Sequence, residues 1–142
     1  MASAAAAVPD RVFKLCVASE SAQFAAAGTI CSSLDSADGF IHLSDRGSAP
    51  TVARLFFADA ADLKLIELSI ARLTSNVAWV VGQMGDAAPP TPLESDAVTI
   101  HYMLPDGCVH VYGSSGVPTS AIVREGDVPL GEDGTHTFPA WL

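Results

Sequence analysis

Short segments in which apolar side chains alternate recur along the chain, and they limit its possible folds more than any other sequence feature. Such alternation is typical of a β-strand, because neighbouring side chains of a strand point to opposite faces of its sheet. The segments are 12–17, 38–44, 63–70, 76–81, 108–112 and 120–124. The strongest is 63–70, and we expect 76–81 to be its neighbour in the sheet.

Helix signals are confined to the first half of the chain. Ser19 is a typical N-cap and Gly28 a typical stop, which predicts a short helix between them. Ser48 and Pro50 begin a second short helix that closes near Asp59. The segment between the two, which contains Ser32, Ser33 and Asp35, is expected to be a polar linker. Two early helices followed mostly by strands indicate an α+β fold with a substantially antiparallel sheet.

The length of 142 residues suits one domain. We expect a flexible tail over 1–10 and a single globular domain over 11–142. Glycines and prolines interrupt 82–100, which predicts a long surface loop there. The pair His101 and Tyr102 follows this loop and would either cover a pocket or anchor the loop. Phe138 and Trp141, near the end, are expected to pack on the core.

The charge of the chain is strongly negative, with seven Lys and Arg against sixteen Asp and Glu and a net charge of −9. No Lys or Arg occurs between Arg72 and Arg124. A nucleic-acid groove or an anionic membrane surface needs clustered cations, so both partners are disfavoured. A small polyanionic ligand is still compatible, because a few local cations suffice to hold it.

Cysteine usage and hydropathy indicate the cellular compartment in which the protein is expected. Cys16, Cys31 and Cys108 are widely spaced and form no C-x-x-C pair, which is typical of a reducing environment. The first ten residues lack the basic and apolar regions of a signal peptide, and no apolar stretch is long enough to span a bilayer. A cytoplasmic protein is expected.

Three ionisable residues stand in the middle of predicted strands: His42, Glu67 and His110. If their strand faces line one cleft, the three side chains could converge there. The alternative is that each is a half-buried polar group on a solvent-facing surface. By alternation, His42 shares its strand face with Phe40 and Ser44. Glu67 shares its face with Leu65 and Ser69, and His110 shares its face with Cys108 and Tyr112.

Two cations follow the 38–44 strand, namely Arg46 and Arg54. They could meet a phosphate group, although single charges of this kind are more often solvated. Motifs of the common enzyme classes are absent: the sequence has no G-x-G-x-x-G, Walker, H-E-x-x-H or G-x-S-x-G pattern.

The segment 38–44, DGFIHLS, resembles the signature of a family of small proteins known as domain of unknown function family 952. The FFA turn at 56–58, the following strand with Glu67, and HVYG at 110–113 are similar to other parts of that family. The resemblance covers about 11–124, and the 82–100 segment departs from it as an inserted loop. Members of the family resemble the ADP-ribosyltransferase fold, which implies a split barrel of two small antiparallel sheets with a cleft that in true transferases holds NAD.

The resemblance also implies residue roles. His42 would grip the nicotinamide ribose, and His110 stands where a transferase has a late-strand glutamate. That glutamate stabilises positive charge in the transition state, which a protonated imidazole would oppose. The strand positions and the resemblance together give His42, His110 and Glu67 as the expected catalytic residues, with these ligand-binding residues around them: Asp38, Phe40, Ser44, Arg46, Arg54 and Tyr112.

Three functions are compatible with these features. The first is binding of NAD, ADP-ribose or a related nucleotide in a His-lined cleft, with ADP-ribosyl or phosphoryl-ribose transfer if the protein is an enzyme. The second is a non-catalytic interaction module that kept the fold and binds a partner at 82–100. The third is a metal-dependent hydrolase in which His42, His110 and Glu67 hold Fe(II) or Zn(II). The sequence leaves the oligomeric state open.

Overall fold

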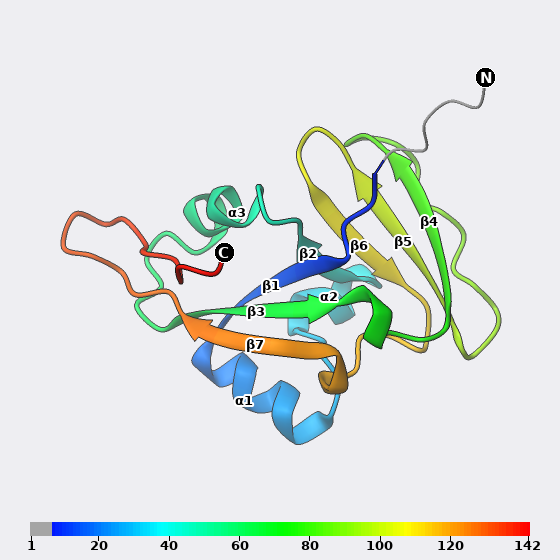
Figure 1. The fold of residues 1–142 in the computed structure, drawn as a ribbon, viewed down its shortest axis with the longest axis horizontal. Coiled ribbons are helices and arrows are strands. Elements are labelled where there is room, and N and C mark those ends of the chain that lie inside the picture. Colours follow the sequence, from blue (N-terminus) through cyan, green and yellow to red (C-terminus); the bar gives the residue numbers. More distant parts are fainter. Residues whose placement is uncertain (1–6) are drawn as a thin grey trace.

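The computed structural model describes residues 7–142, which fold around a mixed sheet with the strand order β4-β5-β6-β2-β1-β3-β7 (Figure 1). The strands are β1 (Arg11–Val17), β2 (Ile41–Ser44), β3 (Leu63–Ser69), β4 (Asn76–Gly82), β5 (Ala97–Met103), β6 (Cys108–Tyr112) and β7 (Ile122–Asp127). Within this described range, β4 and β5 are parallel and every other neighbouring pair is antiparallel. The predicted α+β class is confirmed.

The sheet is continuous, so the expectation of two separate sheets is wrong. Its continuity depends on a narrow junction, because β1 and β2 share only the pair Phe13 and Ser44. By contrast, β1 pairs with β3 along its whole length. β2 has only four residues, which limits how far it can pair with both neighbours in a twisted sheet. The result is a four-stranded half and a three-stranded half that diverge beyond this junction.

Three α-helices accompany the sheet: α1 (Ala18–Ala27), α2 (Ser33–Asp38) and α3 (Ala49–Phe56). Helices α1 and α3 were predicted and lie on opposite faces of the sheet (Figure 1). Helix α2 replaces the expected polar linker. The hydroxyl of Ser32 accepts from the Asp35 backbone N–H, and Gly39 ends the helix with a φ of 81°. Two 3₁₀ turns complete the fold, η1 (Ile70–Arg72) and η2 (Thr119–Ala121).

Alternation along the strands builds one core on each face of the sheet. On β1, Val12 points into a cluster that includes Phe24 of α1, while Phe13 points into a second cluster with Ala53 of α3. The C-terminal segment packs against the second cluster through Phe138, Trp141 and Leu142. The expected docking of the tail on the core is therefore confirmed.

Two expectations about the second half of the chain are wrong, and one of the two alternatives for His101 and Tyr102 is excluded. Strand β4 pairs with β5 at the edge of the sheet, far from β3, because the partner of a strand is decided by tertiary contacts that alternation does not report. The loop predicted over 82–100 is shorter, because its apolar end belongs to β5, and the connection spans 83–96. His101 and Tyr102 lie inside β5 with 3% and 7% exposure, so they cover no pocket.

The N-terminal tail expected over 1–10 lies partly outside the described residues, which begin at residue 7. Residues 7–10 form no helix or strand. Among residues 7–142, no helix has the length and apolar character needed to cross a membrane.

Candidate functional site

A cleft of about 580 Å³ lies where α2, α3 and the neighbouring strands β1, β2 and β6 meet. Cavities of this size hold small organic ligands in many proteins. Its polar lining includes Lys14, Glu20, Ser32, Asp35, Asp38, His42, Ser44 and His110. Its apolar lining includes Leu15, Leu34, Leu43, Val52, Phe56, Phe57 and Met84. The cleft thus combines apolar walls with a group of titratable side chains.

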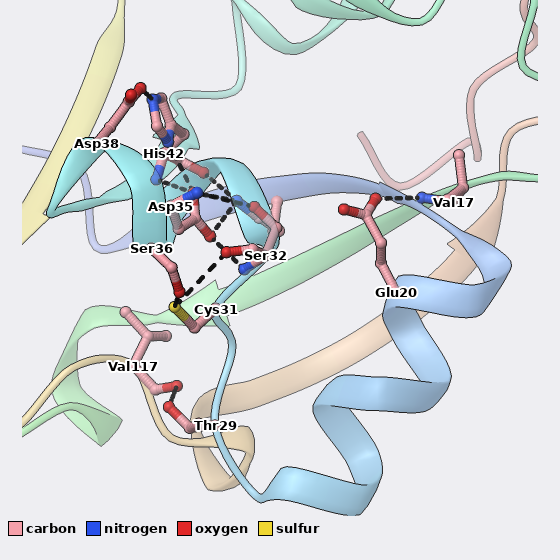
Figure 2. Close-up of polar contacts among 11 residues, drawn as sticks. Val17, Glu20, Thr29, Cys31, Ser32, Asp35, Ser36, Asp38, His42 and Val117 are labelled. Atoms are coloured by element: carbon pink, nitrogen blue, oxygen red, sulfur yellow. Dashed lines mark hydrogen bonds and ion pairs between the residues drawn. The ribbon is translucent and has the colours of Figure 1, made fainter.

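The carboxylate of Asp35 orients His42. The ring Nδ1 of His42 lies 2.7 Å from Asp35 Oδ1, and the His42 backbone N–H donates to the same oxygen at 3.0 Å (Figure 2). Asp35 is 1% exposed. An ionised carboxylate can only accept hydrogen bonds, so Nδ1 carries a proton and the neutral ring offers Nε2 as its acceptor.

Lys14 holds the same carboxylate from β1. Its Nζ donates to the two Asp35 oxygens at 3.0 and 2.8 Å and to the His42 carbonyl at 2.9 Å. Burial acts to raise the pKa of Asp35, but the hydrogen bond from His42 and the charge of Lys14 outweigh it and hold that pKa well below its usual range. Within residues 7–142 no buried side-chain nitrogen or oxygen lacks a hydrogen-bond partner, so this network is complete.

Sequence reasoning gave Lys14 and Asp35 no role in the site. Two signals could have found them. A lysine in the middle of the otherwise apolar run 12–17 needs a buried partner, and Ser32-x-x-Asp35 has the spacing of a capping box.

Asp38 approaches His42 from the opposite side. Its Oδ2 lies 2.9 Å from Nε2 of the ring, and Figure 2 shows Asp35 and Asp38 on either side of His42. The Asp38 side chain is 42% exposed and lines the cleft. A proton on Nε2 would make this contact a hydrogen bond, whereas in the neutral ring both atoms would be acceptors.

His110 lies directly beside His42. The two residues are paired across β2 and β6, and their ring centroids are 5.4 Å apart. Burial, with smaller contributions from His42 and His101, lowers the pKa of His110 to about 4. The ring is therefore neutral near pH 7, and the opposition expected from a protonated imidazole on this strand does not arise.

Two other predicted ligand-binding residues, Phe40 and Tyr112, support these rings without lining the cleft. The Phe40 ring stacks on His110 with centroids 4.1 Å apart and also touches His42 and Tyr112 at 4.5 and 5.1 Å. Ser44, at the end of β2, does line the cleft.

Glu67 is the predicted site residue that the structure separates from the histidines. It lies on β3, and β1 stands between β3 and β2, which puts the two strands roughly 10 Å apart. Its oxygens accept from Arg11 at 2.7 Å and from Arg124 at 2.8 Å. Burial acts to raise the pKa of Glu67, but the hydrogen bonds from Arg124 and Arg11 outweigh it and lower that pKa. Glu67 forms ion pairs with two arginines and is not part of the cleft lining.

This placement removes the ligand set of the metal-hydrolase hypothesis, which needed Glu67 beside the two histidines. Across residues 7–142 no three His, Cys, Asp or Glu side chains are grouped so that they could hold a metal ion.

The two predicted phosphate-binding cations also lie away from the lining. Arg46 donates to the Trp141 carbonyl at 2.8 Å and lies over the Phe13 ring, 5.0 Å from its centroid. Arg54 is on the exposed surface of α3. In the part of the chain that the structure describes, Lys14 is the only Lys or Arg that lines the cleft.

These features define an α+β protein with one mixed sheet and an Asp–His pair in a small-molecule-sized cleft. The chain belongs to the family described as "Protein of unknown function (DUF952)", whose match spans residues 15–125. This confirms the family expected from DGFIHLS and its companion motifs. No curated protein matches the chain.

Solved structures of protein CC0527 from Caulobacter crescentus share the fold. Its crystal structure is 22% identical, with a TM-score of 0.64, and the match covers 89% of this chain and 93% of that one. Its solution NMR structure is also 22% identical, with a TM-score of 0.53 and coverage of 89% and 90%. At this identity the likeness shows the fold alone.

Proposed function

We propose that the cleft binds NAD or a related nucleoside-containing ligand through its nicotinamide–ribose end, with His42 as the acid–base group. The observation that carries this proposal is the 2.7 Å contact between Asp35 and His42 on the cleft wall. A buried carboxylate that orients an imidazole is a common device for proton transfer near neutral pH. The choice of ligand follows the likeness to the ADP-ribosyltransferase fold that the sequence resemblance implies.

The apolar lining suits the flat ring of such a ligand. Leu34, Phe56 and Met84 line the cleft and are 59%, 74% and 52% exposed. A ring placed among them would remove apolar surface from water at about 25 cal/mol per Å². The polar side chains would then meet the ribose hydroxyl groups.

The chemistry available is transfer of a ribosyl group. The bond between ribose C1′ and the nicotinamide nitrogen breaks, and its electron pair leaves with nicotinamide. The oxygen of an acceptor hydroxyl forms the new bond to C1′, and its proton passes to Nε2 of His42. The carboxylate of Asp38 favours the positive charge that develops on the sugar, and the neutral ring of His110 does not oppose it.

The cleft offers few favourable contacts to the phosphate groups of the ligand. Its one lysine is already bound by Asp35, and neither Arg46 nor Arg54 lines it. The ADP part is therefore expected to extend beyond the mouth, and ADP alone should bind far more weakly than NAD.

Calorimetry with NAD, ADP-ribose and ADP tests the proposal. We expect NAD to bind wild-type protein, and His42→Ala to weaken it about tenfold, the value of one charge-assisted hydrogen bond. His136→Ala is the matched control, because His136 lies outside the cleft lining. Absence of NAD binding to folded wild-type protein, or equal affinity in His42→Ala, would contradict the proposal. Release of free nicotinamide, measured separately, distinguishes turnover from binding.

One observation favours a second function, a protein-interaction module. Leu55, 65% exposed, precedes the cleft-lining Phe56 on α3, and Met84, which also lines the cleft, belongs to the 83–96 connection. Exposed apolar surface of this kind is typical of contact sites. In this alternative, NAD would leave the NMR signals of His42 and His110 unchanged, and a partner would shift those of 83–96.

A further inference from the structure

The charges that line the cleft are unbalanced. Glu20, Asp35 and Asp38 bring carboxylates, and Lys14 brings the one ammonium group found there among residues 7–142. The rest of the chain adds to this negative field, since its net charge is −9. The lining therefore disfavours an anion and favours a cation.

The three carboxylates are not equivalent. Asp35 is buried and accepts hydrogen bonds from Lys14, His42 and the Ser32 backbone. Glu20 accepts from the Val17 backbone N–H at 3.0 Å and so caps α1, on a different side of the site in Figure 2.

Asp38 is the carboxylate left for a ligand. Its side chain is 42% exposed, and its one hydrogen-bond or ion-pair partner among the described residues is Nε2 of His42. A ligand that binds beside Nε2 must therefore meet this carboxylate. A ring bound against Leu34, Phe56 and Met84 would displace water from them, and the charge interaction would then be stronger than on an open surface.

We propose that Asp38 makes the cleft select a flat aromatic cation, such as a pyridinium ring, over a neutral or anionic ring of the same size. This inference rests on the proposed function, because it concerns the ring-binding end of the same site. A cation next to the Phe56 ring and the Met84 thioether would also gain from their polarisable surfaces.

Three probes that share one ring test the inference: 1-methylnicotinamide, a cation; nicotinamide, which is neutral; and nicotinate, an anion. Their affinities are measured by NMR titration of wild-type protein, Asp38→Asn and Glu132→Gln. Glu132 is an exposed residue outside the lining, so Glu132→Gln removes the same charge elsewhere. We expect wild-type protein and Glu132→Gln to bind the cation about fivefold more tightly than the neutral ring, the value of a partly exposed ion pair.

In Asp38→Asn the two affinities should become equal, and only the binding of the cation should weaken with added salt in wild-type protein. Equal binding of the cation and the neutral ring by wild-type protein, or an unchanged preference in Asp38→Asn, would overturn this inference and leave the proposed function standing. If no probe binds folded protein that does bind NAD, the inference fails and the proposed function stands; if NAD does not bind either, both fail.

Discussion

Asp35 is the side chain on which the geometry of the candidate site depends most directly. It joins α2 to β1 through Lys14 and to β2 through both the ring and the backbone of His42. Removing one partner of a buried ion pair is costly, because the other partner is left as an uncompensated charge in a water-poor environment. The stability of the fold and the orientation of His42 therefore depend on the same contacts.

We expect Asp35→Asn to lower the free energy of unfolding by about 3 kcal/mol, because it leaves Lys14 as an uncompensated buried charge. Urea unfolding measures this change. The exposed Asp59→Asn is the control, with an expected effect within about 0.5 kcal/mol. The double variant Lys14→Met/Asp35→Leu should recover much of the loss. A cost below about 1 kcal/mol for Asp35→Asn would mean that the ion pair contributes little.

His110 should make the protein less stable as the pH falls from about 6.5 to about 4. Its pKa is lowered in the folded protein to about 4, so across this window the unfolded chain binds a proton that the folded chain does not. Stability from this group is fully present above pH 6.5. Urea unfolding over a pH series should show a shallower loss in His110→Gln than in wild-type protein. An identical slope in His110→Gln and wild type would refute this assignment.

At lower pH the protonation of two buried carboxylates causes the further loss of stability. Asp35 and Glu67 both have pKa values below their ordinary ones, so their contribution is present above an ordinary pKa of about 4 and is lost as the pH falls further. The acid limb of the stability profile thus has an upper part from His110 and a lower part from these carboxylates.

Helix α2 is the element that assembles the site, because it carries both Asp35 and Asp38. Six residues are too few to show a helical period in the sequence, and an isolated helix of this length would not be stable in water. Its stability comes from the capping contacts at Ser32 and from the tertiary contacts of Asp35. The helix could be predicted only from its capping box, and the turn pair Asp38–Gly39 obscured that signal.

Ser32→Ala should cost about 1 kcal/mol, because it removes the side-chain acceptor of the Asp35 backbone N–H. It should also weaken NAD binding, since a frayed α2 no longer holds Asp35 against His42. Ser33→Ala is the matched control, as Ser33 is exposed and lies one position further along. Thermal unfolding and calorimetry report the two effects. Loss of stability with unchanged affinity would show that α2 does not position the site.

Across the whole molecule, the cysteines report how cooperatively the two halves of the sheet unfold. Cys31 is exposed, Cys108 is half-buried in the four-stranded half, and Cys16 is buried in β1 of the three-stranded half. Burial raises the pKa of Cys16 to about 12, so its thiolate is scarce in the folded protein.

A thiol reagent should therefore label Cys31 rapidly, Cys108 slowly and Cys16 only on global unfolding. Labelling followed by mass spectrometry in increasing urea measures this order. If the narrow β1–β2 junction lets one half open alone, Cys108 and Cys16 will become reactive at different urea concentrations. Labelling of Cys16 as fast as Cys31 in native buffer would contradict the position of β1 at the centre of the fold.

The amino-acid sequence by itself determined the local features of this protein. Alternation indicated the strands other than β5 and which side chains of each strand share a face, capping and stop residues indicated α1 and α3, and composition set the acidic charge. These properties depend on neighbouring residues, so they can be predicted without the fold.

The tertiary structure alone decided the strand order and the partners of each buried charge. Lys14 meets Asp35 21 positions away, and Glu67 meets Arg124 57 positions away, on strands whose pairing no local pattern reports. Because β1 lies between β2 and β3, Glu67 is separated from His42 and pairs with two arginines. The carboxylate that contacts His42 is that of Asp35. A buried carboxylate needs a partner, and only the folded chain determines which partner is within reach.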